Sequence, residues 1–413
     1  MYDCVNIDRE INMTSDPLWM AAADAAALLR VSRATLYAYV SRGFVRSQSM
    51  PGRSRERGYA REDVERLRRR TEERRDPDKA AARALQWGLP VLESAITLID
   101  GDRLYYRGHD AVSLARSRSL QEVAALLWIG RFDAPLGGAS HRVPHGQLRA
   151  DRDLPFVGRA QAALARASAR DHRAFDGRGE KAASCGWLIL HLLAQTATGS
   201  RSVGPSIDQA LARAWGAGAR GAEVIRRALI LCADHELNVS SFTARCVASA
   251  GSTPYAVVIG GLAALEGTRH GGASARVEST LASMRRASSL RAALAARVRR
   301  GEPADGFGHP LYARGDPRAS ALLESLAERY AKSAELAFVT DFADAARDVV
   351  HERPNLDFAL ASIARVLRLP AGSPLVLFAI GRTIGWIGHA IEQYATGQLI
   401  RPRAKYVGVV PTA

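Results

Sequence analysis

From about Ala80 to its C-terminus, the chain is a long succession of Ala- and Leu-rich segments separated by Gly and Pro, a pattern that predicts consecutive helices. Apolar residues make up 47% of the 413 residues but aromatic residues only 7%, and Ala, Leu and Arg are very frequent. This length allows two or more domains with a large core. We therefore predict a soluble and mainly α-helical protein.

The sequence indicates no export or membrane insertion. We find no uninterrupted apolar run of about 18 residues, and the first ten residues, MYDCVNIDRE, have neither a positively charged leader nor an apolar core. The four cysteines lack CxxC spacing and lie mostly in apolar helical segments. We expect free thiols, a cytoplasmic location, no metal site and no membrane span.

Positive charge is concentrated near the N-terminus. The net charge is +15, and residues 30–75 alone contain fourteen arginines against six acidic residues. This distribution indicates a polyanionic partner or anionic ligands. We divide the chain into a polar, flexible N-terminus over residues 1–18, a small unit over 19–75 and a large helical unit over 80–413.

The small unit contains signals for three helices and a hairpin. Ala and Leu content predicts a helix over Ala21–Leu29, and Ser32 can cap a second helix over Arg33–Ser41, which Gly43 ends. A basic segment, RSQSMPGRSRERGY, predicts a hairpin, and a charged helix begins near Arg61. In this order the elements resemble the winged helix-turn-helix of MerR-like regulators and excisionases.

This resemblance implies DNA binding, with phosphate contacts that make affinity fall steeply with salt. It places Arg33, Thr35 and Tyr39 on the exposed face of a recognition helix, and Arg53, Arg55 and Arg57 on the wing. Arg30 stands where these families usually have Gly, so we expect a left-handed backbone there at a cost of about 1 kcal/mol. The alternative is a helical hairpin for dimer packing with a solvated basic face.

Six motifs follow one another in the large unit, each of them weak by itself. They are DHELN, GTRHGGAS, DGFGHPLYARGDPR, RPNLDFALAS, GRTIGWIGHAIE and LIRPRAKYVG. In order and spacing they resemble the citrate synthase family, and the similarity extends over about residues 85–413, including the segment Val91–Ala115. It implies the citrate synthase fold, with a large and a small helical lobe, the small one at about residues 255–360, and the site between them.

Condensing a thioester with a 2-oxo acid requires a base and two hydrogen-bond donors. The resemblance makes Asp357 the base that removes a methyl proton, His270 the donor to the thioester carbonyl and His309 the donor to the 2-oxo acid carbonyl. Each residue also has a structural explanation. Asp357 suits the first turn of a helix, and His270 suits a helix C-terminus.

The remaining site residues are implied by the same motifs. For the carboxylates of oxaloacetate they are His235, Asn238, Arg318, Arg382 and Arg401, and guanidinium groups can pair with carboxylates through two parallel bonds. For coenzyme A they are Gly306, Gly308, Arg314 and Asn355. By family analogy Arg401 reaches into the partner's site, which implies a homodimer. Ser274 and Pro310 depart from the usual Asn and Arg.

We expect an acyltransferase that condenses acetyl-CoA with oxaloacetate to give citrate and CoA, with no cofactor besides the acetyl-CoA co-substrate. Three alternatives stay open. A 2-methylcitrate synthase would use propionyl-CoA with the same residues, since one methylene contributes only about 1–3 kcal/mol of discrimination. A DNA-binding transcription regulator could use the synthase fold as a metabolite sensor, and an inactive structural homologue is also possible.

Overall fold

The computed structural model describes residues 18–50, 53–75, 91–137, 153–176 and 179–409. The chain forms two compact units, Met1–Glu93 and Ser94–Ala413, each described here by itself. The segment expected to be flexible, residues 1–18, lies outside the described residues except for Leu18.

The N-terminal unit combines three helices with a three-stranded antiparallel sheet. Its elements are β1 (Trp19–Ala21), α1 (Ala22–Leu29), α2 (Arg33–Ser41), β2 (Ser47–Met50), β3 (Arg53–Ala60) and α3 (Arg61–Arg75). The strand order is β1-β3-β2, so the predicted hairpin forms and the unpredicted β1 pairs with β3. Leu36, Val45, Tyr59 and Val64 are the centre of its core.

Two local predictions for this unit are confirmed. The hydroxyl of Ser32 accepts a hydrogen bond from the backbone N–H of Thr35 at 3.1 Å, and therefore caps α2. Arg30 has φ +54° and ψ +45°, the left-handed conformation that the usual glycine would adopt with less strain. Its backbone N–H donates to carbonyls at the end of α1 and closes that helix.

The large unit begins with a small antiparallel sheet of order β4-β5-β6 and continues as helices. Its first elements are β4 (Thr97–Asp100), β5 (Arg103–Tyr106), β6 (His109–Asp110), α5 (Ala111–Ser117), α6 (Leu120–Ile129), α8 (Phe156–Ser168), the 3-10 helix η1 (His172–Phe175), α9 (Gly179–Thr198), α10 (Ile207–Ala214), α11 (Gly218–Leu231), α12 (Val239–Ser249) and α13 (Pro254–Leu265). The last are α14 (Gly272–Met284), α15 (Leu290–Arg299), α16 (Pro317–Tyr330), α17 (Ala334–Val350), α18 (Leu356–Val366) and α19 (Ser373–Thr396).

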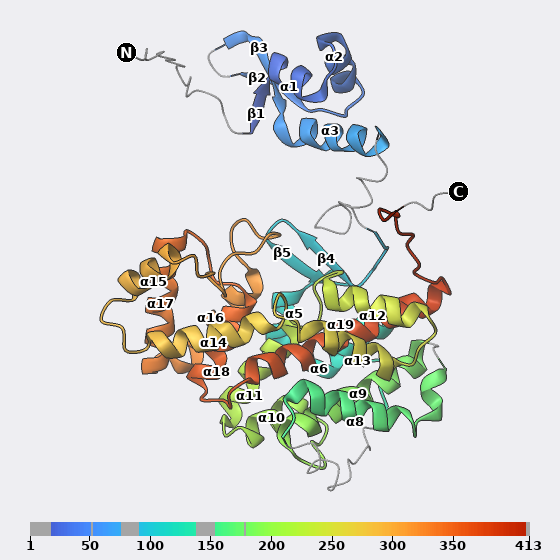
Figure 1. Ribbon diagram of the computed structural model, residues 1–413, viewed down its shortest axis with the longest axis vertical. Helices are drawn as coiled ribbons and strands as arrows, with labels where there is room; N and C mark the ends of the chain where they lie inside the picture. Colours follow the sequence, from blue (N-terminus) through green and yellow to red (C-terminus); the bar gives the residue numbers. More distant parts are fainter. Residues whose placement is uncertain (1–17, 51–52, 76–90, 138–152, 177–178, 410–413) are drawn as a thin grey trace. The chain divides into compact units, whose positions relative to one another are not determined.

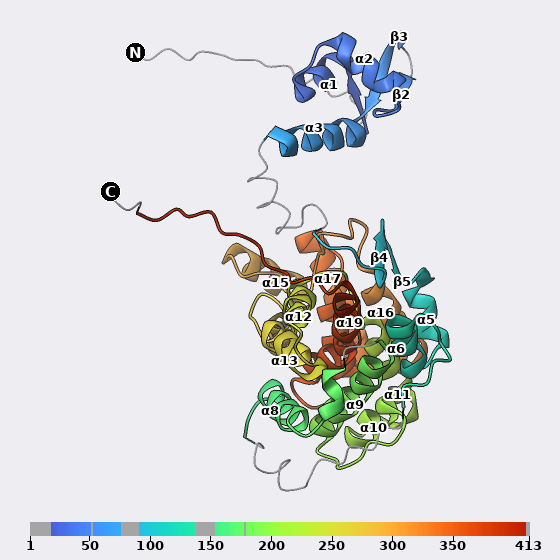
Figure 2. The same cartoon turned by 90° about the vertical axis from the view of Figure 1, so that its right-hand side faces the viewer.

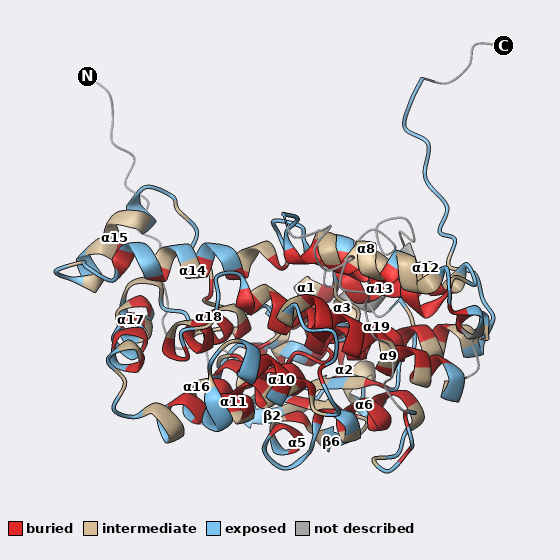
Figure 3. Ribbon diagram, turned by 90° about the horizontal axis from the view of Figure 1, so that it is seen from below, coloured by how far each residue is buried: buried red, intermediate tan, exposed pale blue. Residues whose placement is uncertain are grey.

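Helix α19 lies in the middle of this unit (Figures 1 and 2) and packs against α6, α9, α11, α12, α13, α14 and α18. It is buried along most of its length (Figure 3). Glycines let it approach α11 closely, because a Cβ on Gly381 would lie 2.5 Å from the carbonyl oxygen of Leu229. One on Gly385 would lie 2.4 Å from Oδ1 of Asp234. This close packing fixes the chain just before His235.

Among the described residues, α19 is the one helix long and apolar enough to cross a membrane by length and composition. Helix α19 contains no uninterrupted apolar run of about 18 residues, because Arg382 and His389 lie among its apolar residues. In the structure, 89% of its most apolar window is buried inside the protein.

Helices α14 to α18 lie together on one side of the unit (Figure 1), with α14 and α16 packed on α18 and α15 packed on α17. Helix α13 packs instead against α8, α12 and α19. This mutually packed group begins at Gly272, inside the range of about residues 255–360 predicted for the small lobe.

Candidate active site

The DHELN motif forms the connection between α11 and α12. Asn238 caps α12, its Oδ1 accepting from the N–H groups of Ser240 and Ser241 at 3.1 Å each. Its Nδ2 is buried and, among the described residues, has no hydrogen-bond partner. A buried donor of this kind needs an acceptor. This geometry suits the predicted contact of Asn238 with a substrate oxygen.

Asp234 holds this connection in place from inside the core. Its carboxylate accepts from the hydroxyl of Thr97 at 2.6 Å and from the backbone N–H of Glu236 at 3.1 Å. It also lies 3.1 Å from Nε2 of His389, and both side chains of this pair are fully buried. Glu236 has φ +53°, a strained conformation that the surrounding bonds maintain. Between these two residues, His235 is directed by a rigid backbone.

His270 lies just before α14 and contacts α12. Its Nε2 is 2.9 Å from the hydroxyl of Ser240, which also accepts from Nε1 of Trp386 at 3.1 Å and lies 2.8 Å from Oδ1 of Asn238. Its ring packs edge-on against Phe378 of α19. Burial lowers the pKa of His270 to about 4, and the nearby Arg382 contributes, so the ring is neutral at pH 7.

His309 belongs to a loop that pairs with the segment leading into α18. Phe307 forms a β-bridge with Pro354, and the backbone N–H of Asn355 donates to the carbonyl of Gly306 at 2.8 Å. Nδ1 of His309 accepts the N–H of Leu311 at 3.2 Å, so the neutral ring carries its proton on Nε2. Burial lowers the pKa of His309 to about 4, with a further contribution from the positive charge of Arg318.

His235, His309 and Tyr312 form one aromatic cluster. The rings of His235 and His309 are 5.0 Å apart between centroids, and the Tyr312 hydroxyl is 2.9 Å from Nε2 of His235. Burial, with the charges of Arg318 and Arg382, holds the pKa of His235 well below its ordinary value. Tyr312 lies in the same HPLY segment as His309 but was not among the predicted site residues.

Asp357 is in the first turn of α18, as predicted. Its backbone N–H donates to Oδ1 of Asn355 at 3.0 Å, and its own Oδ1 accepts from the hydroxyl of Ser274 at 2.5 Å. Burial raises the pKa of Asp357 above the ordinary value, and the Ser274 hydrogen bond opposes that rise. Ser274, noted only as a departure from the family pattern, therefore touches the predicted base.

Two of the three predicted arginines, Arg318 and Arg382, are buried, and each donates hydrogen bonds from part of its guanidinium group to a neighbouring oxygen. Arg318 donates from Nε and Nη2 to the two oxygens of Asp316, at 2.9 and 2.8 Å. Asp316 caps α16 and also accepts the backbone N–H of Leu356 at 3.1 Å. Arg382 donates from Nε to the carbonyl of Cys232 at 2.8 Å. The remaining Nη groups are available to carboxylates.

The structure does not bring every predicted residue into this cluster. Arg401 is exposed in the extended segment after α19. Arg314 is 84% exposed and pairs with Asp102 of the β4–β5 turn. Asn355 uses its side chain to cap α18 and to donate to the carbonyl of Gly308 at 3.1 Å. Gly306 and Gly308 have φ values of +90° and +76°, so they shape the His309 loop directly.

In the N-terminal unit, the residues predicted for DNA binding differ in exposure. Arg33 and Arg57 are exposed, as expected. Thr35 and Tyr39 are only half-exposed, because the Thr35 hydroxyl lies 2.9 Å from that of Ser32 and the Tyr39 ring packs against the core and Phe44. Arg53 and Arg55 lie in β3, and their side chains are outside the described residues.

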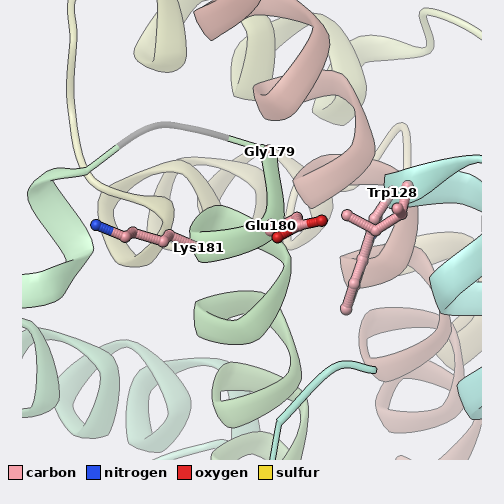
Figure 4. A pocket seen from close by; sticks show the side chains of 5 residues that line it. Trp128, Gly179, Glu180 and Lys181 are labelled. Carbon is pink, nitrogen blue, oxygen red and sulfur yellow. The ribbon is translucent and has the colours of Figure 1, made fainter. Parts of the chain in front are cut away.

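A pocket of about 510 Å³ opens between α6 and α9. Trp128, Ile129, Gly179, Glu180 and Lys181 line it (Figure 4). None of these residues belongs to the motifs that predicted the site, so this pocket is separate from the histidine cluster.

Comparison with known proteins identifies the family. The family model described as "Citrate synthase, C-terminal domain" matches residues 81–403. The chain belongs to the citrate synthase family. Among curated citrate synthase relatives, the "Citrate synthase" of Haloferax volcanii is 32% identical over 366 residues, which cover 78% of this chain and 94% of that protein.

Two further relatives match over shorter segments. "Putative citrate synthase 2" of Mycobacterium tuberculosis is 37% identical over 198 residues, 46% of this chain and 53% of that protein. "2-methylcitrate synthase 2" of Corynebacterium glutamicum is 35% identical over 185 residues, 44% of this chain and 48% of that protein. The matched segment thus spans about half the length of these two relatives.

Solved citrate synthases share the fold. The enzyme from Thermotoga maritima superposes with a TM-score of 0.65 at 26% identity, covering 79% of this chain and 96% of that one. The enzyme from Thermoplasma acidophilum, in a ternary complex with carboxymethyl coenzyme A and oxaloacetate, gives a TM-score of 0.68 at 23% identity, covering 80% of this chain and 97% of that one. The predicted citrate synthase fold is therefore confirmed for the large unit.

Proposed function

We propose that the chain condenses acetyl-CoA with oxaloacetate to give citrate and CoA, as an acyltransferase that needs no cofactor beyond the acetyl-CoA co-substrate. The observation that carries this proposal is the arrangement of two neutral histidines, His270 and His309, with the carboxylate of Asp357 on elements that pack together. Family membership supports it.

In the proposed first step Asp357 removes a proton from the acetyl methyl group. The electron pair of that C–H bond moves to the thioester oxygen, which accepts a hydrogen bond from His270. The hydroxyl of Ser240 donates to Oδ1 of Asn238 at 2.8 Å and lies 2.9 Å from Nε2 of His270. In the proposed step that hydroxyl turns its proton toward Nε2, so that the neutral His270 ring carries its own proton on Nδ1 and can donate it to the thioester oxygen.

In the second step the enol carbon attacks the keto carbon of oxaloacetate. The proton on Nε2 of His309 polarises the keto oxygen, and the rigid loop around Gly306 fixes that donor. Arg318, Arg382, His235 and Asn238 bind the carboxylates. Hydrolysis of the resulting citryl-CoA releases citrate and CoA.

Coenzyme A is assigned to the segment around Gly306, Gly308, Arg314 and Asn355. We place the small lobe, at about residues 255–360, opposite the large lobe, and closure of the two would exclude water from the thioester. The mutual packing of α14 to α18 supports this division. The residue ranges 19–75 and 80–413 are likewise proposed as the two functional domains.

The active form is proposed to be a homodimer in which Arg401 completes the neighbouring site. Its exposure on the segment after α19 supports this role, because an exposed guanidinium group can reach a neighbouring subunit. The free thiols of Cys185, Cys232 and Cys246 support the proposed cytoplasmic location.

Measuring thiol release tests the reaction. Wild type is expected to release CoA from acetyl-CoA or propionyl-CoA only with oxaloacetate present, and Asp357→Ala is expected to abolish release. No release with either thioester would contradict the proposal. A higher kcat/KM for propionyl-CoA would instead favour the 2-methylcitrate synthase function that the name of the Corynebacterium relative indicates.

The N-terminal unit is proposed to be a winged helix-turn-helix that binds DNA, which would make the chain an enzyme and a regulator at once. The order of its elements and the exposed Arg33 and Arg57 support this proposal. A mobility shift on the promoter region of its own gene should weaken steeply with salt. Equal binding by a chain that starts near Ala80 would contradict the proposal, whereas dimer loss on that truncation would favour the packing alternative.

A further inference from the structure

Ser274 is fully buried beside the carboxylate of Asp357. Its hydroxyl donates to Oδ1 of Asp357 at 2.5 Å. Within the described residues, Oδ2 of Asp357 has no hydrogen-bond partner. The two oxygens of one carboxylate are therefore in different surroundings.

The position of Ser274 is fixed by the start of α14. Its backbone N–H donates to the carbonyl of Gly271 at 3.3 Å. A Cβ on Gly271 would lie 2.6 Å from the carbonyl oxygen of Leu265 and 2.7 Å from Leu375, so only glycine fits at this contact with α13 and α19. His270 directly precedes this turn. One short segment thus carries both His270, the predicted hydrogen-bond donor to the thioester oxygen, and Ser274, which touches the predicted base Asp357.

Several ionisable groups lie near Asp357. The residues facing it are Arg318 and Asp316 at the start of α16, Asp305 in the preceding loop, Arg276 on α14 and Cys232 at the end of α11. Arg276 donates from Nε and Nη2 to both oxygens of Asp305, at 2.8 Å each, and Arg318 is paired with Asp316. Since each of these cations already has a carboxylate partner, Ser274 is the group in direct contact that favours the anion of Asp357.

We infer that Ser274 is a positioning residue for the base, which binds Oδ1 of Asp357 and leaves Oδ2 as the oxygen that takes the methyl proton. This inference rests on the proposed condensation. In that step the C–H bond of the methyl group breaks and an O–H bond forms at Oδ2. The electron pair moves to the thioester oxygen beside His270, and Ser274 keeps its own proton throughout.

Without this hydroxyl, the carboxylate would lose its orienting bond and its stabilisation as an anion. Burial would then raise the pKa of Asp357 further. The base would be protonated over more of the working pH range, and its rotation would no longer be restricted. Both effects act on kcat and leave oxaloacetate binding unchanged, because the carboxylate-binding arginines do not touch Ser274.

The test compares Ser274→Ala with Ser274→Thr, which keeps the hydroxyl, and with Ser283→Ala as a matched control. Ser283 is an exposed serine on the same helix that donates only to the backbone carbonyl of Thr280. For Ser274→Ala we expect kcat to fall roughly 10- to 100-fold, because one hydrogen bond to a charged group is lost. KM for oxaloacetate should stay unchanged. The acid limb of the kcat profile should move to higher pH. Ser274→Thr should recover part of kcat, and Ser283→Ala should match wild type.

An infrared titration of the Asp357 carboxyl group separates this inference from the proposed function. The infrared spectrum of the same protein carrying the additional substitution Asp357→Asn is subtracted at each pH, which isolates the signal of the Asp357 carboxyl group. The measurement requires no turnover. Carboxyl protonation at higher pH in Ser274→Ala supports the role of Ser274 even if wild type proves inactive, an outcome that contradicts only the condensation. Identical titrations and identical pH profiles in wild type and Ser274→Ala would overturn the inference.

Discussion

The hydroxyl of Tyr312 lies 2.9 Å from Nε2 of His235, and this contact joins two of the motifs that predicted the site. The Tyr312 ring is also 4.9 Å from that of His309, and the guanidinium carbon of Arg318 lies 5.7 Å from its centroid. One buried phenol thus contacts three residues assigned to the substrate. Its position makes it a positioning residue for His235.

Tyr312→Phe should raise KM for oxaloacetate by roughly 10-fold, because the hydrogen bond to His235 is lost while the ring packing remains. Steady-state kinetics with oxaloacetate as the varied substrate measure this. Tyr394→Phe is the matched control, since it removes a hydroxyl that donates to the carbonyl of Ser252. An unchanged KM in Tyr312→Phe would show that His235 is held by its backbone alone.

Stability should fall as the pH drops from about 6.5 toward 4. The pKa values of His270 and His309 are about 4 in the folded chain, below the value of about 6.5 in an unfolded one. The unfolded state therefore binds more protons in this window, and each histidine contributes up to about 1.4 kcal/mol for each pH unit. This stability is fully present above about pH 6.5.

Urea unfolding at several pH values checks this dependence. The double variant His270→Gln/His309→Gln should lose less free energy of unfolding than wild type between pH 6.5 and 4.5. His172→Gln, which changes an exposed histidine, serves as the control. Equal pH dependence in wild type and the double variant would contradict the prediction.

Gly306→Ala should be much more damaging than Gly301→Ala. Both glycines have positive φ, +90° and +74°, so both substitutions carry a backbone cost of about 1 kcal/mol. Only at Gly306 would the new Cβ meet neighbours, Val277 at 3.0 Å and Phe358 at 3.1 Å, whereas nothing lies within 4 Å at Gly301. Gly306→Ala should therefore displace the His309 loop and lower kcat. Equal kcat in the two variants would show that the loop adapts.

Arg30→Gly should stabilise the N-terminal unit by about 1 kcal/mol, since glycine adopts φ +54° with less strain. Amide hydrogen exchange in α1 and α2 of the full chain measures the local free energy of opening. Arg42→Gly, at the end of α2 with φ −88°, is the control, and no gain is expected there. Faster exchange in Arg30→Gly would mean that the arginine side chain stabilises the turn.

Local predictions held wherever short-range chemistry decides the structure. The helix over Arg33–Ser41 and its Ser32 cap depend on residues within one turn of one another. The lack of an uninterrupted apolar run did not indicate that α19 is a long, mostly apolar helix. Helix α19 tolerates Arg382 and His389 inside a buried helix because the carbonyl of Cys232 and the carboxylate of Asp234 satisfy them.

The sequence by itself determined the helical class, the three helices and the hairpin of the small unit, and the motifs that contain His270, His309 and Asp357. These follow from periodicity, capping and motif spacing, which are local properties of the chain. Only the tertiary structure decided that Ser274 touches Asp357, that Tyr312 contacts His235 and that Arg314 pairs with Asp102. Those contacts join residues 77 to 212 positions apart in the chain, and contacts of this range have no signature in a single sequence.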